Sequence, residues 1–174
     1  MNKYKSRKDV PDKYKWDLTE FFKNNEEFDK ELNSLTKEIE VIKEYKGCTK
    51  DSKKLVEFIK TSLNLDIRLE NLAVYAFLKN DEEKGIKENI ERNNKVELLY
   101  STYANYCSFF KPELLSLSKE DYEKLFDNKD LDEFKFMLDE TYKDKEHSLN
   151  ESEEKIIIDL MTATGNMEIS VNSP

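Results

Sequence analysis

The feature that most constrains the fold of this chain is an apolar seam with the period of an α-helix. Five apolar residues follow one another at spacings of four, three, four and three: Phe28, Leu32, Leu35, Ile39 and Ile42. This spacing places their side chains on one face of a helix. We expect the helix to have Thr19 as its N-cap, to end at Gly47, and to pack in a bundle rather than in a coiled coil.

Two more long helices are predicted downstream. The first begins at Asp51 or Ser52 and ends near residue 79. Its buried side is predicted to consist of Leu55, Phe58, Ile59, Leu63, Leu69, Leu72, Ala73, Ala76 and Phe77. The second covers about 82–110 and is stopped by Pro112, because proline disfavours a helical residue before it. Short links between the three helices predict that neighbours run antiparallel.

The second half of the 82–110 helix carries more apolar residues than one face can hold. They are Leu98, Leu99, Tyr100, Tyr103, Ala104, Tyr106, Cys107, Phe109 and Phe110. A helix that is apolar on nearly its whole circumference must be covered on more than one side. Together with the run 156–158, three isoleucines, these residues give more hydrophobic surface than a small bundle readily covers.

Shorter helices complete the predicted architecture. Ser118 begins one that ends near residue 126, and Asp121 stands at its capping-box position. Others are expected over 131–143 and 150–165. The fold class is therefore all-α, an antiparallel bundle of three long helices plus several short helices. Its predicted parts are an N-terminal extended arm (1–17), a helical domain (18–165) and an irregular tail (166–174).

Composition agrees with an ordered helical chain and excludes several classes of function. Only three Gly and three Pro interrupt the 174 residues, and aromatic residues reach 11%. Lys and Arg total 29 against 38 Asp and Glu, a net charge of −9, so nucleic acid is not expected as a partner. No uninterrupted apolar stretch is long enough to cross a membrane, and no membrane association is expected.

The N-terminus and the cysteines point to the cytoplasm. Met1 is followed by a basic stretch, as in a signal peptide, but Asp9-Val10-Pro11-Asp12 stands where an apolar core would be needed. Cys48 and Cys107 are far apart in the sequence and are predicted to be reduced thiols. The expected location is therefore cytoplasmic.

The sequence contains no recognisable catalytic or metal site. His147 is the single histidine, whereas the H-E-x-x-H zinc motif needs two on one helix face. A Cys107–His147 nucleophile pair is conceivable, but Cys107 lies among apolar residues and is predicted to be a buried structural thiol. We therefore predict no catalytic, cofactor-binding or metal-binding residue and no cofactor in this chain.

Adjacent carboxylates are frequent in so acidic a chain. Three pairs stand out: Glu26-Glu27, Glu82-Glu83 and Glu153-Glu154. None has apolar neighbours that would hold a proton at neutral pH, so they are predicted to lie on solvated helix faces. The three glycines, at positions 47, 85 and 165, are too isolated to form a phosphate-binding loop.

Four stretches resemble the N-terminal region of oligoendopeptidase F, a family of thimet-like zinc metallopeptidases. They occur in the same order as in the family. They are Tyr14-Lys15-Trp16-Asp17-Leu18-Thr19-Glu20-Phe21-Phe22 for Y-x-W-D-L-T, Leu72-Ala73-Val74-Tyr75-Ala76-Phe77-Leu78 with Asp81 for Y-A-x-L…D, Phe109-Phe110-Lys111-Pro112-Glu113-Leu114-Leu115 for F-x-P-E-I-L, and His147-Ser148-Leu149-Asn150-Glu151-Ser152-Glu153-Glu154 for H-x-L-S-x-E-E-E. No catalytic or zinc-binding residue of the family falls within these stretches.

The resemblance implies a non-catalytic helical lobe that forms one wall of a cleft for short peptides. The implied partners are the catalytic domain of the same parent chain and the peptides in its cleft, and zinc is expected in the missing catalytic part. Trp16 is predicted to anchor the arm onto the bundle rather than to contact substrate. The alternative function is a stand-alone helical module that binds a partner protein through its apolar surface.

Overall fold

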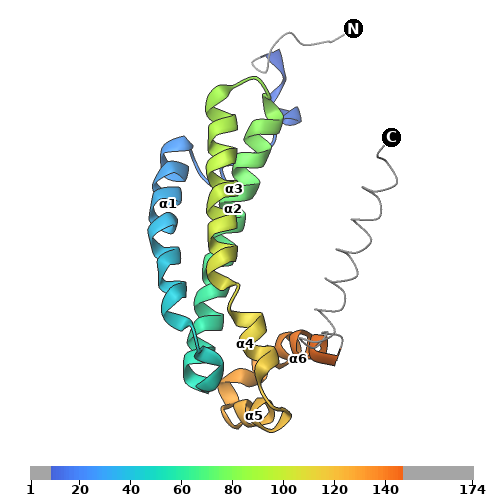
Figure 1. Ribbon diagram of the computed structural model, residues 1–174. Helices are drawn as coiled ribbons and strands as arrows, with labels where there is room; N and C mark the ends of the chain where they lie inside the picture. The colour runs from blue at the N-terminus through green and yellow to red at the C-terminus, as the bar shows by residue number, and fades with distance from the viewer. Residues whose placement is uncertain (1–8, 147–174) are drawn as a thin grey trace, which may run out of the picture. The chain divides into compact units, whose positions relative to one another are not determined.

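The computed structural model describes residues 9–146, and every regular element in that range is helical (Figure 1). The α-helices are α1 (Asn25–Glu38), α2 (Ser52–Glu82), α3 (Lys87–Cys107), α4 (Phe110–Ser116), α5 (Lys119–Lys124) and α6 (Lys135–Lys143). The 3₁₀ segments are Asp12–Tyr14, Ile39–Tyr45, Cys48–Lys50, Leu125–Asp127, Lys129–Phe134 and Asp144–Glu146. The predicted all-α class with three long helices is confirmed.

The described residues fall into two compact units. The first ends at Glu133 and holds α1 to α5, and the second begins at Phe134 and holds α6. In the first unit α1, α2 and α3 run side by side, and the α2–α3 hairpin forms its most extensive helix pairing (Figure 1). Within α6 the Lys135 ammonium pairs with the Asp139 carboxylate at 3.0 Å. The predicted helix over 150–165 and the tail lie outside the described residues, and the predicted division into arm, domain and tail stays a prediction.

The apolar seam is confirmed, but the predicted N-cap of its helix is wrong. All five seam residues are at most 6% exposed. The N-cap is Asn24, whose side-chain oxygen accepts from the Glu27 amide at 2.9 Å. Thr19 lies in an earlier turn, where its amide donates to Asp17 at 3.0 Å. Asn24 is favoured because Glu26 and Glu27 follow it and stabilise the positive end of the helix.

The end of the first helical segment agrees with the sequence. After Glu38 the chain continues as the 3₁₀ segment Ile39–Tyr45 and then reaches Gly47 with φ 83°. That left-handed conformation strains any residue with a Cβ. α2 then begins as predicted, with Asp51 as its N-cap accepting from the Lys53 amide at 2.9 Å.

Two predicted boundaries near the third helix are wrong. α2 continues to Glu82 because Asn and Asp cost a helix only a few tenths of a kcal/mol. Ion pairs such as Lys84–Asp81, at 3.0 Å, also stabilise the end of α2.

Pro112 does not stop a helix: α3 has already ended at Cys107, and Pro112 lies in the first turn of α4. Proline fits there because the first amides of a helix have no partner within the helix.

Two residues predicted for the buried side of α2 are exposed instead. Leu63 and Phe77 are 41% and 57% exposed, whereas Leu55, Leu69 and Leu72 are buried. The physical reason is that α2 carries two apolar stripes, and the rest of the described chain covers only one of them.

The short helices α5 and α6 lie where helices were predicted, whereas α4 was not predicted. The Ser118 hydroxyl oxygen accepts from the Asp121 amide at 3.1 Å as the N-cap of α5. The helix predicted over 131–143 is divided, since the chain is 3₁₀ up to Phe134 and α-helical from Lys135.

Candidate functional site

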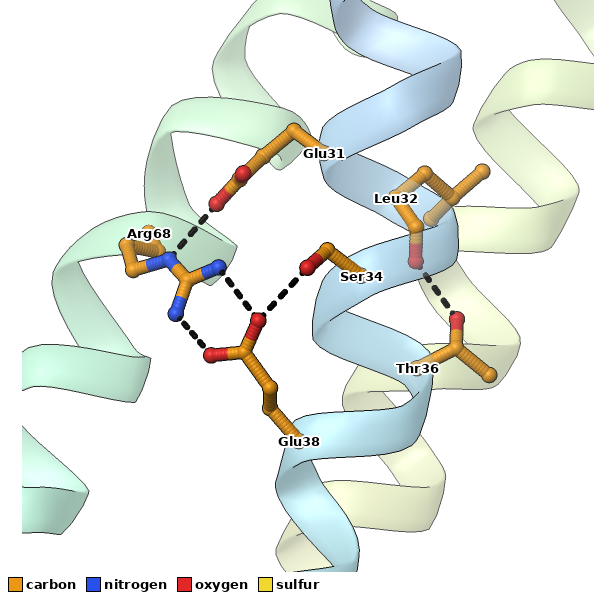
Figure 2. Close-up of polar contacts among 6 residues, drawn as sticks. All are labelled: Glu31, Leu32, Ser34, Thr36, Glu38 and Arg68. Carbon is orange, nitrogen blue, oxygen red and sulfur yellow. Dashed lines mark hydrogen bonds and ion pairs between the residues drawn. The ribbon is translucent and has the colours of Figure 1, made fainter.

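Arg68 is the centre of a polar cluster that joins α2 to α1 (Figure 2). Its Nε donates to Glu31 at 2.6 Å, and its two terminal nitrogens donate to the Glu38 carboxylate, one of them at 3.1 Å. The Ser34 hydroxyl donates to the same carboxylate at 2.6 Å. The hydrogen bond from Arg68 is the main reason that the pKa of Glu38 is lowered to about 2. Both carboxylates already have partners, so the cluster holds the helices together.

The family-like N-terminal stretch is held to the bundle by Leu18 and Phe22. Leu18 is 5% exposed, and the Phe22 ring meets the rings of Phe28 and Tyr75 edge-on at 5.5 and 5.3 Å. Trp16 is 52% exposed, so the prediction that it anchors the arm is wrong. The aromatic anchor is Phe22, because it reaches the gap between α1 and α2.

The second family-like stretch contributes Tyr75, which is 2% exposed. Its ring stacks on Phe28 at 5.2 Å, and its hydroxyl donates to the Asn25 side-chain oxygen at 3.0 Å. Burial raises the pKa of the Tyr75 phenol, and the hydroxyl stays protonated as a donor. Tyr75 therefore fixes the start of α1 against α2.

The third family-like stretch contacts the link that precedes α2 and the first half of α2. Both carboxylate oxygens of Glu113 accept from the Gly47 amide, at 3.0 and 2.9 Å. Phe109 and Phe110 lie against the Phe58 ring, with centroids 5.5 and 4.9 Å away. The three stretches with described residues thus join segments that are distant in the sequence, and the structure accounts for them as contacts that hold the fold.

The thiols of the chain are protonated. Cys48 is fully buried, and desolvation raises its pKa to about 12. Cys107 is half-buried beside Tyr103, and burial raises its pKa as well. Among residues 9–146 no group of three His, Cys, Asp or Glu side chains could hold a metal ion. His147 lies outside the described residues, so the prediction of no catalytic or metal-binding residue stays a prediction.

One predicted carboxylate pair differs from expectation. The Glu82 side chain is only 11% exposed and lies 4.0 Å from the Lys79 ammonium, so this residue is not on a solvated face. Glu26, by contrast, is exposed in the first turn of α1. Glu153-Glu154 lies outside the described residues. The difference arises because α2 runs on through Glu82, beyond its predicted end.

Two of the concave surfaces of the first unit differ clearly in chemistry. A groove of about 520 Å³ between α1 and α3 is lined by Asp29, Glu40, Lys95, Leu98 and Thr102, among others. The Tyr106 hydroxyl donates to Glu40 at 2.8 Å at one side of it. Carboxylate, ammonium, hydroxyl and apolar groups therefore face one groove, which we call the α1–α3 groove.

The second surface is almost entirely apolar. It is a hollow of about 340 Å³ between α2 and α3 whose lining includes Val74, Phe77, Val96 and Tyr100. Ile67, 63% exposed, and Leu63 continue the same side of α2. We define the α2–α3 apolar face as five residues: Leu63, Ile67, Val74, Phe77 and Tyr100.

The sequence contained a signal for the α2–α3 apolar face that the predictions missed. Leu63, Ile67, Val74 and Phe77 are spaced by four, seven and three residues, which is a helical stripe distinct from that of Leu55, Leu69 and Leu72. The predicted apolar excess of the third helix is found at Leu98 and Tyr100, which are 69% and 52% exposed.

The described part of the chain has no helix that is both long enough and apolar enough to span a membrane.

Comparison with known proteins gives consistent matches. The family model described as Oligopeptidase F matches residues 113–168. Group B oligopeptidase PepB of Streptococcus agalactiae is 34% identical over 154 residues, 87% of this chain and 26% of the relative. The plasmid oligoendopeptidase F of Lactococcus lactis subsp. cremoris is 31% identical over 156 residues, 88% of this chain and 26% of the relative. The chain thus spans about a quarter of the length of these relatives.

A solved structure has the same fold. The crystal structure of a candidate peptidase from Chlamydophila abortus superposes with a TM-score of 0.77 at 21% identity. The superposition covers 91% of this chain and 27% of the other.

Proposed function

Because this chain belongs to the oligoendopeptidase F family and matches its N-terminal region, we propose that it is the non-catalytic helical lobe of a zinc-dependent oligoendopeptidase. The observation that carries the proposal is the continuous match over 87% of this chain to 26% of a named oligopeptidase. The described residues do not fit a zinc site. We therefore assign the zinc and the peptide hydrolysis to the part of the parent outside this chain.

The α1–α3 groove supports a role as one wall of a peptide cleft. A short peptide offers amide donors, carbonyl acceptors, two charged ends and apolar side chains. The groove offers the half-exposed carboxylate of Asp29, a cation at Lys95 and an exposed apolar side chain at Leu98. These groups complement an extended peptide without reacting with it.

The reading frame beyond Pro174 gives the most direct test. Continuation for several hundred residues into an H-E-x-x-H motif is the expected result, and a stop codon immediately after Pro174 contradicts the proposal.

A second test uses the purified chain. We expect no cleavage of fluorogenic peptides with or without added zinc. Zinc-dependent turnover that co-purifies with the chain, and that does not come from a contaminating peptidase, contradicts the non-catalytic role.

The proposal includes a cytoplasmic location. Cys48 and Cys107 support it, because both are free thiols in the structure. Fractionation of the source cells, with recovery of the chain outside the cytoplasmic fraction, would contradict it.

The α2–α3 apolar face favours a second candidate, a stand-alone module that binds a partner protein. The reading frame separates the two, because a stand-alone module requires the chain to end at or near Pro174.

A further inference from the structure

The exposed apolar side chains of the α2–α3 apolar face lie along one side of α2 and on the neighbouring part of α3. Ile67 is 63% exposed, Phe77 57%, Tyr100 52% and Leu63 41%. The three exposed residues of α2 share one side of that helix with Val74. Val74, Phe77 and Tyr100 line one hollow. Removing large apolar side chains of this kind from water is favourable.

The fold of the first unit does not use this face. α1 binds α2 from the side of Arg68, Leu72 and Tyr75, through the Arg68 ion pairs and the Tyr75 ring contacts. Ile67 and Val74 are seven residues apart, a spacing that keeps both on one side of α2. The face is therefore open in the described residues, and a group of exposed large apolar side chains on one side of a helix indicates a docking site.

Two carboxylates beside these apolar residues indicate which chemistry a partner should have. Glu70 lies between Ile67 and Val74 on the same side of α2, and Glu97 lines the hollow. The Glu97 carboxylate accepts a hydrogen bond from the Asn93 side-chain amide at 2.7 Å. Neither carboxylate forms an ion pair with a Lys or Arg of residues 9–146. A partner with Lys or Arg beside an apolar surface would complement these carboxylates.

The same charges disfavour a second copy of the chain. Two copies joined through this face would bring the Glu70 and Glu97 carboxylates of one copy near those of the other. Each copy also carries a net charge of −9. Like charges at an interface destabilise it, so a self-complementary dimer is the wrong occupant.

We propose that the α2–α3 apolar face docks onto the remainder of the parent polypeptide, through an apolar segment flanked by Lys or Arg. The proposal rests on the function proposed above. This chain corresponds to only 26% of the length of its relatives, so most of the parent is available to cover the face. The face is the attachment surface of the lobe, and the α1–α3 groove stays open to peptides.

A chimera provides the test. This chain replaces the matched 154 residues of Group B oligopeptidase PepB, and Phe77→Cys is introduced both in the chimera and in the isolated chain. Leu98→Cys is the matched control, because Leu98 is an apolar residue of α3 that is 69% exposed but lies in the α1–α3 groove. Iodoacetamide labelling of each introduced thiol is followed by peptide mass spectrometry, which separates these thiols from Cys48 and Cys107.

We expect the thiol introduced by Phe77→Cys to react about tenfold more slowly in the chimera than in the isolated chain, since a covered position reacts only when the contact opens. The thiol introduced by Leu98→Cys should react at about the same rate in both. Equal rates for Phe77→Cys in both contexts overturn the docking surface. Peptide cleavage by the chimera is a separate readout: a folded chimera that cleaves no peptide contradicts the proposed function, while the labelling ratio still decides the docking surface.

A second measurement tests the proposal if the chimera does not fold. The isolated chain is mixed with the separately expressed remainder of PepB, and binding is measured by sedimentation. Ile67→Lys should abolish binding and Leu98→Lys should preserve it. Binding that survives Ile67→Lys, or no binding by the unmodified chain, overturns the proposal. A dimer of the isolated chain that Ile67→Lys dissolves would also overturn it, in favour of a second copy.

Discussion

The two sides of α2 reverse the usual relation between residue type and exposure. On the side that faces α1, Arg68 has a side chain that is 26% exposed, because it reaches Glu31 and Glu38. Its sequence neighbour Ile67, on the open side, is 63% exposed. Exposure along this helix therefore depends on which side is packed against another helix. We call these the closed side and the open side of α2.

The largest expected effect is at the core of the closed side. Leu72 is fully buried, and Leu72→Ala should lower the free energy of unfolding by about 2–5 kcal/mol, because it removes buried methyl groups and leaves a cavity. The matched change on the open side, Ile67→Ala, should cost less than about 0.5 kcal/mol. Urea denaturation of both variants measures the contrast, and similar losses would show that the open side is covered.

The next effect concerns Gly47, which lies in the link before α2. Gly47 has φ 83°, and a Cβ there would meet no atom within 4 Å, so the cost of Gly47→Ala is backbone strain alone. We expect about 1–2 kcal/mol of lost stability. Gly85→Ala is the control, since that site is equally open and is not in the left-handed region. Thermal unfolding of the two variants should differ accordingly; equal midpoints would contradict the assigned strain.

A smaller effect is expected for the Arg68 cluster, and it depends on pH. The folded-state pKa of Glu38, about 2, lies below the ordinary value of 4.5. Its contribution is therefore complete above pH 4.5 and disappears as the pH falls towards 2. Arg68→Met, which keeps an apolar stem, should cost about 1 kcal/mol near neutral pH, because the Glu38 side chain is 45% exposed and the pair is screened by water.

Denaturation at several pH values tests this contribution. The difference between the unmodified chain and Arg68→Met should be constant from neutral pH down to about 5 and should shrink below pH 4.5. Ser34→Ala is a control that leaves the ion pair in place. A difference that grows on acidification would contradict the role given to Glu38.

Local patterns in the sequence predicted the helices well. The spacing of the seam from Phe28 to Ile42 identified the buried face of the first helical segment. Asp51 and Ser118 were recognisable as N-caps, since capping depends on residues only two or three positions away. Gly47 was recognisable as an end, because its conformation is a local property.

Features that depend on distant contacts could not be predicted in this way. Glu113 accepts from Gly47 across 66 positions, and Arg68 pairs with Glu38 across 30. Periodicity assigned Phe77 to an apolar stripe, but it could not say which stripe of α2 would be covered. Trp16 was expected to be the anchor, whereas the ring that contacts both α1 and α2 is that of Phe22.

The smallest expected effect on stability is on the open side, and it is the sharpest check of the comparison. Phe77→Lys places a charge on a position that is 57% exposed. We expect a change of no more than about 0.5 kcal/mol in the isolated chain, because the side chain has little packing to lose. Binding of a fluorescent dye that reports apolar surface should fall nevertheless, since Phe77 contributes to the hollow with Val74 and Tyr100. Leu98→Lys should leave the dye at the α2–α3 apolar face in place. If Phe77→Lys instead costs as much as Leu72→Ala, the open side of α2 is part of the core and the contrast between the two sides is wrong.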